Sequence, residues 1–177
     1  MKKLLLLLLI SLGFIGSANA EICDETSTIQ NRNGLLFLPN QTQPFSGENL
    51  CVYENGQYKV QGKYTNGLKD GVWTGWRKNG IRMVEAIYIL GSLQTETLFS
   101  PDHYKKVMQI NYINGIEEFS IVWIYFDNGK LGKETNIKGD KKNGRTTQWH
   151  LNGNKEYEGN YIDDVAQGIW ISWHENG

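Results

Sequence analysis

Alanine and an excess of charge of one sign are what this sequence lacks. Only four alanines occur in 177 residues, two of them within the first 20, against 20 glycines. Since alanine is the best helix former and glycine one of the poorest, this composition argues against a helical bundle. The formal net charge is −1, so there is no basic field with which to bind nucleic acid. With 40% hydrophobic and 12% aromatic residues, the chain is also too apolar to be disordered.

Long apolar runs are absent as well, apart from one at the N-terminus. Lys2 and Lys3 precede an apolar stretch over residues 4–15, and the small residues Ala18-Asn19-Ala20 follow it. This order is typical of a secretory signal peptide that is cleaved after Ala20. The alternative, a membrane anchor, requires about 20 apolar residues, more than this run contains. We therefore expect an exported protein, periplasmic or extracellular, that does not span a membrane once the leader is removed.

Cysteine is scarce, with Cys23 and Cys51 as the two members of one pair. In an exported chain a single pair predicts a disulfide, which would pin the N-terminal segment onto the rest of the protein. Two free thiols are the alternative at this point. A metal site is not expected here, because no histidine stands nearby to complete a set of ligands.

The chain repeats itself with a period of 24 residues. GVWTGWRKNG at 71–80 recurs as GIWISWHENG at 168–177, and related segments begin at 47, 120 and 144. The gap between 71 and 120 is two periods plus one residue, which places a sixth, eroded unit near Thr95. Such a period indicates supersecondary units that bury their faces against their neighbours. We divide the chain into a leader at 1–20, a lead-in or cap at 21–46, and a repeat array at 47–177.

Each regular unit carries an Asn-Gly pair between two runs of alternating polar and apolar residues, as at Asn55-Gly56 and Asn79-Gly80. The alternation favours strands, and Asn-Gly favours a two-residue type I′ hairpin turn. A unit is therefore predicted as strand, tight turn, strand and a looser return loop. Stacked units predict an all-β fold without helices, an extended antiparallel meander of β-hairpins in a single-layer twisted sheet.

The predicted turn also fixes which residues lie opposite each other. It places Tyr64 opposite Gly47 and Tyr161 opposite Gly144, so we expect these tyrosine rings to cover glycines of the sheet. At one repeat position the other face then bears Val52, Trp76, Tyr125, Trp149 and Trp173, with acids or amides diagonal to them. The candidate binding residues on this face are Trp76, Tyr125, Trp149, Trp173, Glu85, Glu134 and Glu158.

Two interpretations of this face remain open. Large, stiff rings give contact area at low entropic cost, and the acids would favour a basic or hydroxyl-rich partner. Alternatively, the rings cover the sheet and the acids keep that face soluble.

The repeat resembles the MORN-repeat family, in the bacterial variant of the YwqK-family antitoxins. The resemblance rests on G-x-W-x-x-W/Y-x-x-N-G followed by Y-x-N/D-G/D, as in GVWTGWRKNG and Tyr64-Thr65-Asn66-Gly67, and on the lead-in NGLLFLPN at 33–40. It covers about residues 33–177. It implies an extended array of β-hairpins without catalytic residues that acts as a scaffold or interaction surface.

Residues that could carry out catalysis do not form a recognisable constellation. His150 and His174 recur at one repeat phase and are expected two strands apart, too far to share a zinc ion, while His103 stands elsewhere. Asp140 and Asp163-Asp164 fall between strands, where they are expected to form turns. We therefore expect no enzymatic activity, no cofactor and no metal.

Two hypotheses on function follow. The first is an exported, non-enzymatic repeat scaffold for protein–protein interaction in the cell envelope, antitoxin-like or immunity-like, with an unknown protein as partner. The second is a carbohydrate or envelope-surface binding module that uses stacked aromatics. The low net charge makes nucleic acid an unexpected partner for either.

Overall fold

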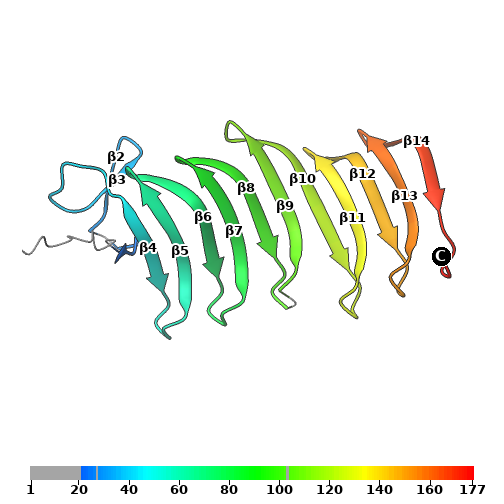
Figure 1. Ribbon diagram of the computed structural model, residues 1–177, viewed down its shortest axis with the longest axis horizontal. Coiled ribbons are helices and arrows are strands. Elements are labelled where there is room, and N and C mark those ends of the chain that lie inside the picture. The colour runs from blue at the N-terminus through cyan, green and yellow to red at the C-terminus, as the bar shows by residue number, and fades with distance from the viewer. Residues whose placement is uncertain (1–20, 27, 103) are drawn as a thin grey trace, which may run out of the picture.

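The computed structural model describes residues 21–26, 28–102 and 104–177, and the fold of these residues is all-β (Figure 1). The predicted leader and its cleavage site at Ala20 lie outside the described residues. Each strand from β4 to β14 is hydrogen-bonded to the next along the chain, and these pairs are antiparallel, so the predicted hairpin meander is confirmed.

The strands of the meander follow one another at regular intervals. Their bounds are β4 (Gly47–Val52), β5 (Tyr58–Thr65), β6 (Leu68–Trp76), β7 (Arg82–Ile89), β8 (Ser92–Phe99), β9 (Lys106–Ile113), β10 (Ile116–Tyr125), β11 (Leu131–Lys138), β12 (Lys141–Trp149), β13 (Lys155–Ile162) and β14 (Val165–Ser172). Strand β1 (Glu21–Ile22) pairs in parallel with β4, and β2 (Gln30–Arg32) forms a separate hairpin with β3 (Leu35–Phe37).

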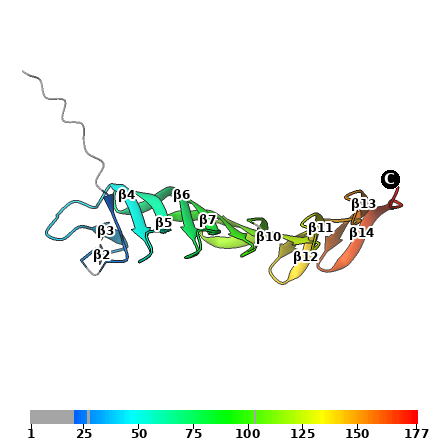
Figure 2. The same ribbon diagram turned by 90° about the horizontal axis from the view of Figure 1, so that it is seen from below.

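The meander is a single layer. Each of its strands contacts its sheet neighbours, and seen edge-on the sheet is a thin, twisted ribbon (Figure 2). No described helix is long and apolar enough to cross a membrane.

The two kinds of turn are the reverse of what the sequence predicted. At the Asn-Gly turn of the first unit, the Gly56 amide donates to the carbonyl of Tyr53 (2.9 Å), and the positive φ belongs to Gly56 (79°) rather than to Asn55. This is a three-residue loop, a type I turn followed by a left-handed residue, and not the predicted type I′ turn. The tight two-residue turns lie at the opposite edge of the sheet, as at Asn66-Gly67, with φ angles of 50° and 80°.

The side chain of asparagine explains this reversal. Asn55 Oδ1 accepts the backbone N–H of Gln57 (3.3 Å), and Asn128 Oδ1 accepts that of Lys130 (2.9 Å). The asparagine thus closes the turn with its own oxygen and does not need a left-handed backbone.

The predicted pairing of residues nevertheless holds, because two deviations cancel. Gly47 lies opposite Tyr64 and Gly144 opposite Tyr161, as predicted. The three-residue loop displaces the pairing by one residue, and a β-bulge displaces it back. The bulged residue is Lys59 in β5, and its counterparts in the other regular hairpins are Met83, Gly132 and Glu156.

The sequence predicted that tyrosine rings cover glycines of the sheet, but the rings that do so belong to other residues. A Cβ atom added to Gly144 would meet Asn136 first (3.3 Å) and not Tyr161, whereas one added to Gly62 would lie 2.2 Å from a ring atom of Trp73. Gly159 has the same relation to Trp170. The covering rings are therefore the first tryptophans of G-x-W-x-x-W, on the next strand.

The lead-in packs on one face of the first hairpins, which we call the cap face. Leu36 and Phe45 join Tyr64, Trp73 and Ala86 in a buried hydrophobic cluster. Backbone hydrogen bonds fasten the segment to the β5–β6 turn, from Leu36 N to Gly67 O (3.0 Å) and from Gly67 N to Phe45 O (2.7 Å).

A disulfide between Cys23 and Cys51 holds the beginning of the lead-in against β4, as predicted. Beside it, the Tyr64 hydroxyl donates to Asp24 Oδ2 (2.7 Å). Burial of the ring, together with this hydrogen bond to a carboxylate, raises the pKa of Tyr64 well above its usual value.

Candidate functional site

We call the face opposite the cap the open face. It carries a row of rings and cations near the strand ends that are joined by the three-residue turns. The aromatic–cation row runs across the strands and consists of Tyr58, Trp76, Arg82, Phe99, Lys105, Tyr125, Trp149, Lys155 and Trp173. It contains all four predicted binding aromatics. Among the described elements, no strand from elsewhere in the chain packs over it.

The β-bulges determine which residues of the row lie opposite each other. Beyond each bulge the strands pair one residue out of the preceding register, so Trp76 lies opposite Arg82 and Trp149 opposite Lys155. Since paired residues of an antiparallel ladder point to the same side, a ring and a cation are brought together on the open face.

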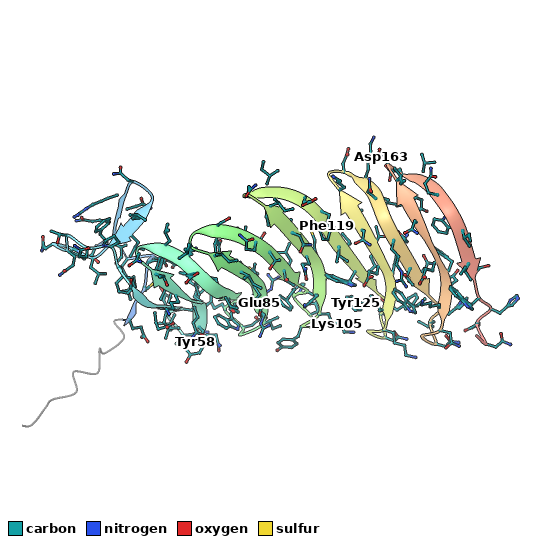
Figure 3. All side chains as sticks on the ribbon, turned by 45° about the horizontal axis from the view of Figure 1, so that its top comes forward. Tyr58, Glu85, Lys105, Phe119, Tyr125 and Asp163 are labelled. Carbon is teal, nitrogen blue, oxygen red and sulfur yellow. A yellow bond between two sulfur atoms is a disulfide. The ribbon has the colours of Figure 1, made fainter. Side chains whose placement is uncertain are left out.

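Cations lie over rings of the following strands. Arg82 is 5.2 Å from the centre of the Phe99 ring, Lys105 is 4.8 Å from that of Tyr125 (Figure 3), and Lys155 is 5.4 Å from that of Trp173. These distances suit cation–π attraction. At the first units the contact is between two rings, those of Tyr58 and Trp76, with 5.9 Å between their centres. The row is therefore internally packed.

The three predicted glutamates lie on the open face, and each is already engaged. Glu85 Oε2 is 3.0 Å from Arg82, Glu134 Oε2 accepts the indole N–H of Trp123 (2.7 Å), and Glu158 Oε2 accepts Lys155 (2.6 Å). Arg145 also bonds Glu158.

The engagement of the acids changes the electrostatics expected from the sequence. Hydrogen bonds from Lys155 and then Arg145 lower the pKa of Glu158. Burial, with Glu134 nearby, raises the pKa of Tyr125. The acids thus support the row through their hydrogen bonds to Arg82, Trp123 and Lys155.

Two hollows flank the β8–β9 turn, which belongs to the eroded unit. One, of about 320 Å³, is lined by Trp76, Arg82, Phe99 and Tyr104. The other, also of about 320 Å³, is lined by residues that include Lys105, Trp123, Tyr125 and Asp127.

The turn between the hollows lacks the Asn-Gly of the regular turns. Two asparagine side chains reach from one regular turn to the next, from Asn55 Nδ2 to the Lys78 carbonyl (3.1 Å) and from Asn152 Nδ2 to the Glu175 carbonyl (2.6 Å), while between the turns at Asn128 and Asn152 the link is from Lys130 Nζ to the Asn152 carbonyl (2.8 Å). The turn from Ser100 to Lys105 is closed by a backbone bond between these residues (2.8 Å) and carries no asparagine. The two hollows lie on either side of this turn.

Sequence reasoning missed about half of the row. Tyr58, Arg82 and Lys155 each stand eleven residues after the start of their unit, so the 24-residue period contained a signal for them. Phe99 and Lys105 belong to the eroded unit, whose pairing is shifted, with Thr95 opposite Asn111. No repeat signal marks these two residues.

The other candidate residues have structural partners. His150 Nε2 lies 3.0 Å from the Trp173 carbonyl, and His174 is exposed. Asp164 Oδ1 accepts the Lys142 amide (2.9 Å), and Asp163 and Asp164 both have positive φ, so this pair forms a turn as predicted.

One described cluster brings three groups of metal-ligating type within 4.8 Å of one another: Cys23, Glu25 and Cys51. Both sulfur atoms are bonded to each other in the disulfide, and Glu25 pairs with Lys59. The cluster has no thiolate with which to bind a metal.

Comparison with known proteins gives no family. No protein-family model matches the chain, and no curated protein matches it. A mutant of S. aureus TarM in complex with Fondaparinux, alpha-GlcNAc-glycerol and UDP is similar at 16% identity, with a TM-score of 0.36 over 66% of this chain and 21% of that one. A second crystal structure of TarM gives 17% identity, a TM-score of 0.34, and coverage of 63% and 21%. This chain thus spans about a fifth of TarM's length.

Proposed function

We propose that the protein is an exported, non-enzymatic repeat scaffold that binds an elongated protein partner along its aromatic–cation row. The observation that carries the proposal is an open face, in a single-layer sheet, that bears rings at regular intervals with no described element over it. Aromatic and arginine side chains are the residue types most enriched among those that dominate binding energy.

The rigidity of the row supports this role. Cations and neighbouring rings already restrain the aromatic side chains, so a partner would order few rotamers on binding. Repetition along the sheet lets adjacent units add contacts to one elongated partner.

A non-enzymatic role agrees with the state of the polar groups. On the open face, the carboxylates at 85, 134 and 158 are held by arginine, tryptophan and lysine side chains. Their ordered partners serve packing, whereas a general acid or base needs a group poised to exchange a proton with a substrate.

Export is supported by the leader-like N-terminus and by the disulfide, which persists in oxidising compartments. Together with the resemblance to MORN-repeat antitoxins, this supports a partner in the cell envelope. Among the roles that this resemblance implies, an immunity-like role outside the cytoplasmic membrane is the one that an exported protein could carry out.

The test compares the two faces of the sheet. The immobilised protein is incubated with envelope fractions of the source cells, and retention is measured for Trp76→Ala, Trp149→Ala and Glu134→Gln, with Trp170→Ala on the cap face as control. We expect wild type and the control to retain the same proteins, and the Trp76 and Trp149 variants to lose them while remaining folded by circular dichroism.

Equal retention by all variants, with lower melting temperatures for the two open-face tryptophan variants, would return these rings to a purely structural role. Retention of envelope glycan in place of protein would favour the carbohydrate-binding alternative, for which the aromatic-lined hollows of about 320 Å³ are the supporting observation.

A further inference from the structure

The row has a repeat distance that can be compared with that of a ligand. One 24-residue unit contributes two strands, and neighbouring strands are about 4.7–4.9 Å apart, so equivalent positions recur about every 9.4–9.8 Å across the sheet. A polyproline II helix rises about 3.1 Å per residue with three residues per turn, which gives about 9.3 Å per turn. An extended peptide in this conformation, lying across the strands, would present the same residue to each successive unit.

The lining of the two hollows suits proline. Trp76, Phe99 and Tyr104 surround one hollow, and Trp123 with Tyr125 borders the other. Grooves between aromatic rings are the sites at which polyproline II segments dock, because the preformed helix loses little entropy on binding. The hollows lie on either side of one turn of the sheet, at neighbouring units of the row.

The charges of the row select the residues that accompany proline. Arg82 lines the first hollow and Lys105 the second. The Lys105 ammonium contacts the Tyr125 ring and the Gly129 carbonyl, and none of the described salt bridges includes it. Asp127 is the single acid lining the second hollow, and the other two cations of the row, Arg82 and Lys155, are paired with Glu85 and Glu158. Lys105 is thus the cation of the row that a carboxylate of the ligand would complement.

A glycan fits this surface less well. Recognition of hydroxyl groups needs available polar side chains, and the carboxylates at 85, 134 and 158 are engaged within the sheet.

We propose that the aromatic–cation row binds an acidic, proline-rich segment in the polyproline II conformation, with one three-residue turn of the ligand on each hairpin unit. This inference rests on the proposed function and specifies the chemistry of its partner.

The probe is a fluorescent peptide of matched length and period, (Pro-Pro-Glu)4. Its 12 residues span about 37 Å as polyproline II, and the eight strand spacings from β6 to β14 span about 38 Å. Binding to the purified, disulfide-bonded protein is measured by fluorescence anisotropy. Controls are a peptide of the same composition without the three-residue period, the charge-reversed (Pro-Pro-Lys)4, and chitohexaose as a glycan probe.

We expect the periodic acidic peptide to bind about tenfold more tightly than the shuffled one, a difference of about 1.4 kcal/mol. Lys105→Gln should weaken binding about threefold, as expected of an exposed charge pair, and Trp76→Ala about tenfold or more. The matched control is Lys142→Gln, because Lys142 lies over the Tyr161 ring (4.9 Å) on the cap face. This variant should bind the peptide like wild type.

Equal affinity for periodic and shuffled peptides, tighter binding of (Pro-Pro-Lys)4, or insensitivity to Lys105→Gln would each overturn the inference. Binding of chitohexaose in place of the peptides would do so as well and would assign the row to glycans. If the peptides fail to bind while Trp149→Ala still abolishes capture of envelope proteins, the polyproline chemistry is refuted and the scaffold function stands.

Discussion

A single added methyl group at Gly62 tests how the tryptophan rings hold the hairpins together. In Gly62→Ala the new Cβ would lie 2.2–2.7 Å from three atoms of the Trp73 ring, where carbon atoms need about 3.5–4.0 Å. The ring must therefore move by more than about 1 Å. Its neighbours are the rings of Tyr64 and Tyr88, with centres 5.0 and 6.4 Å away, and Trp73 is only 4% exposed.

The confinement of the Trp73 ring determines how much stability Gly62→Ala should lose. Overpacking of a well-ordered core costs about 1–3 kcal/mol, and we expect Gly62→Ala to lie near the upper end, at about 3 kcal/mol. The lower chain entropy of alanine offsets this by about 0.5–1 kcal/mol or less. For a chain of this size, the net loss of about 2–2.5 kcal/mol lowers the melting temperature by about 4–10 °C.

Gly159→Ala is the matched control. Its Cβ would be just as close to Trp170, but that ring is half-buried and is not covered by the lead-in, so it can swing toward solvent. We expect a loss of about 1 kcal/mol.

Urea unfolding, followed by circular dichroism and by tryptophan fluorescence with the disulfide intact, measures both variants. A Gly62→Ala protein within about 0.5 kcal/mol of wild type, or equal losses at the two sites, would refute the idea that Trp73 is locked by the cap.

Three further perturbations have expected outcomes. Reduction of the Cys23–Cys51 disulfide, a sequence separation of 28 residues, should lower the free energy of unfolding by about 3.6 kcal/mol on the chain-entropy model, measured by urea unfolding with and without reductant. Tyr64→Phe removes a hydrogen bond to a carboxylate and should cost about 1.5–3 kcal/mol. Since the pKa of Tyr64 is raised in the folded protein, its contribution is present below pH 10 and lost as pH rises further, so the difference between Tyr64→Phe and wild type should shrink in alkaline urea titrations. The pKa of Glu158 is lowered, so its contribution is present above pH 4.5 and lost as pH falls through the folded-state pKa. Glu158→Gln should therefore lose less stability than wild type between pH 5 and pH 3 in thermal melts.

The sequence determined the architecture because the same local pattern of residues recurs in each repeat unit. A period of 24 residues with alternating polarity and an Asn-Gly at the hairpin turn of each regular unit permits strand, turn and strand at each recurrence, and sequential hairpins pair with their neighbours. The pairing of Gly47 with Tyr64 and of Gly144 with Tyr161 could therefore be predicted. The four aromatics of the row were predictable for the same reason, since alternation assigns them all to one face.

The tertiary structure decided the type of turn and the residues that cover the glycines, which the 24-residue period does not encode. Asn-Gly suits two kinds of turn, and the bond from Asn55 Oδ1 to the Gln57 amide favours the three-residue form, which then requires a bulge at Lys59. The partner of a glycine depends on that local geometry, so Trp73 rather than a tyrosine covers Gly62.

The side-chain contacts within the aromatic–cation row also depend on the tertiary structure. The carboxylates of Glu85 and Glu158 looked free in the sequence, but the bulges bring Arg82 and Lys155 to the face they share. Lys105 reaches Tyr125 only because the eroded unit follows a different turn. Local pattern fixes which strands form and which side chains share a face, whereas the contacts between side chains of neighbouring units depend on distances of a few ångströms that only the folded sheet defines.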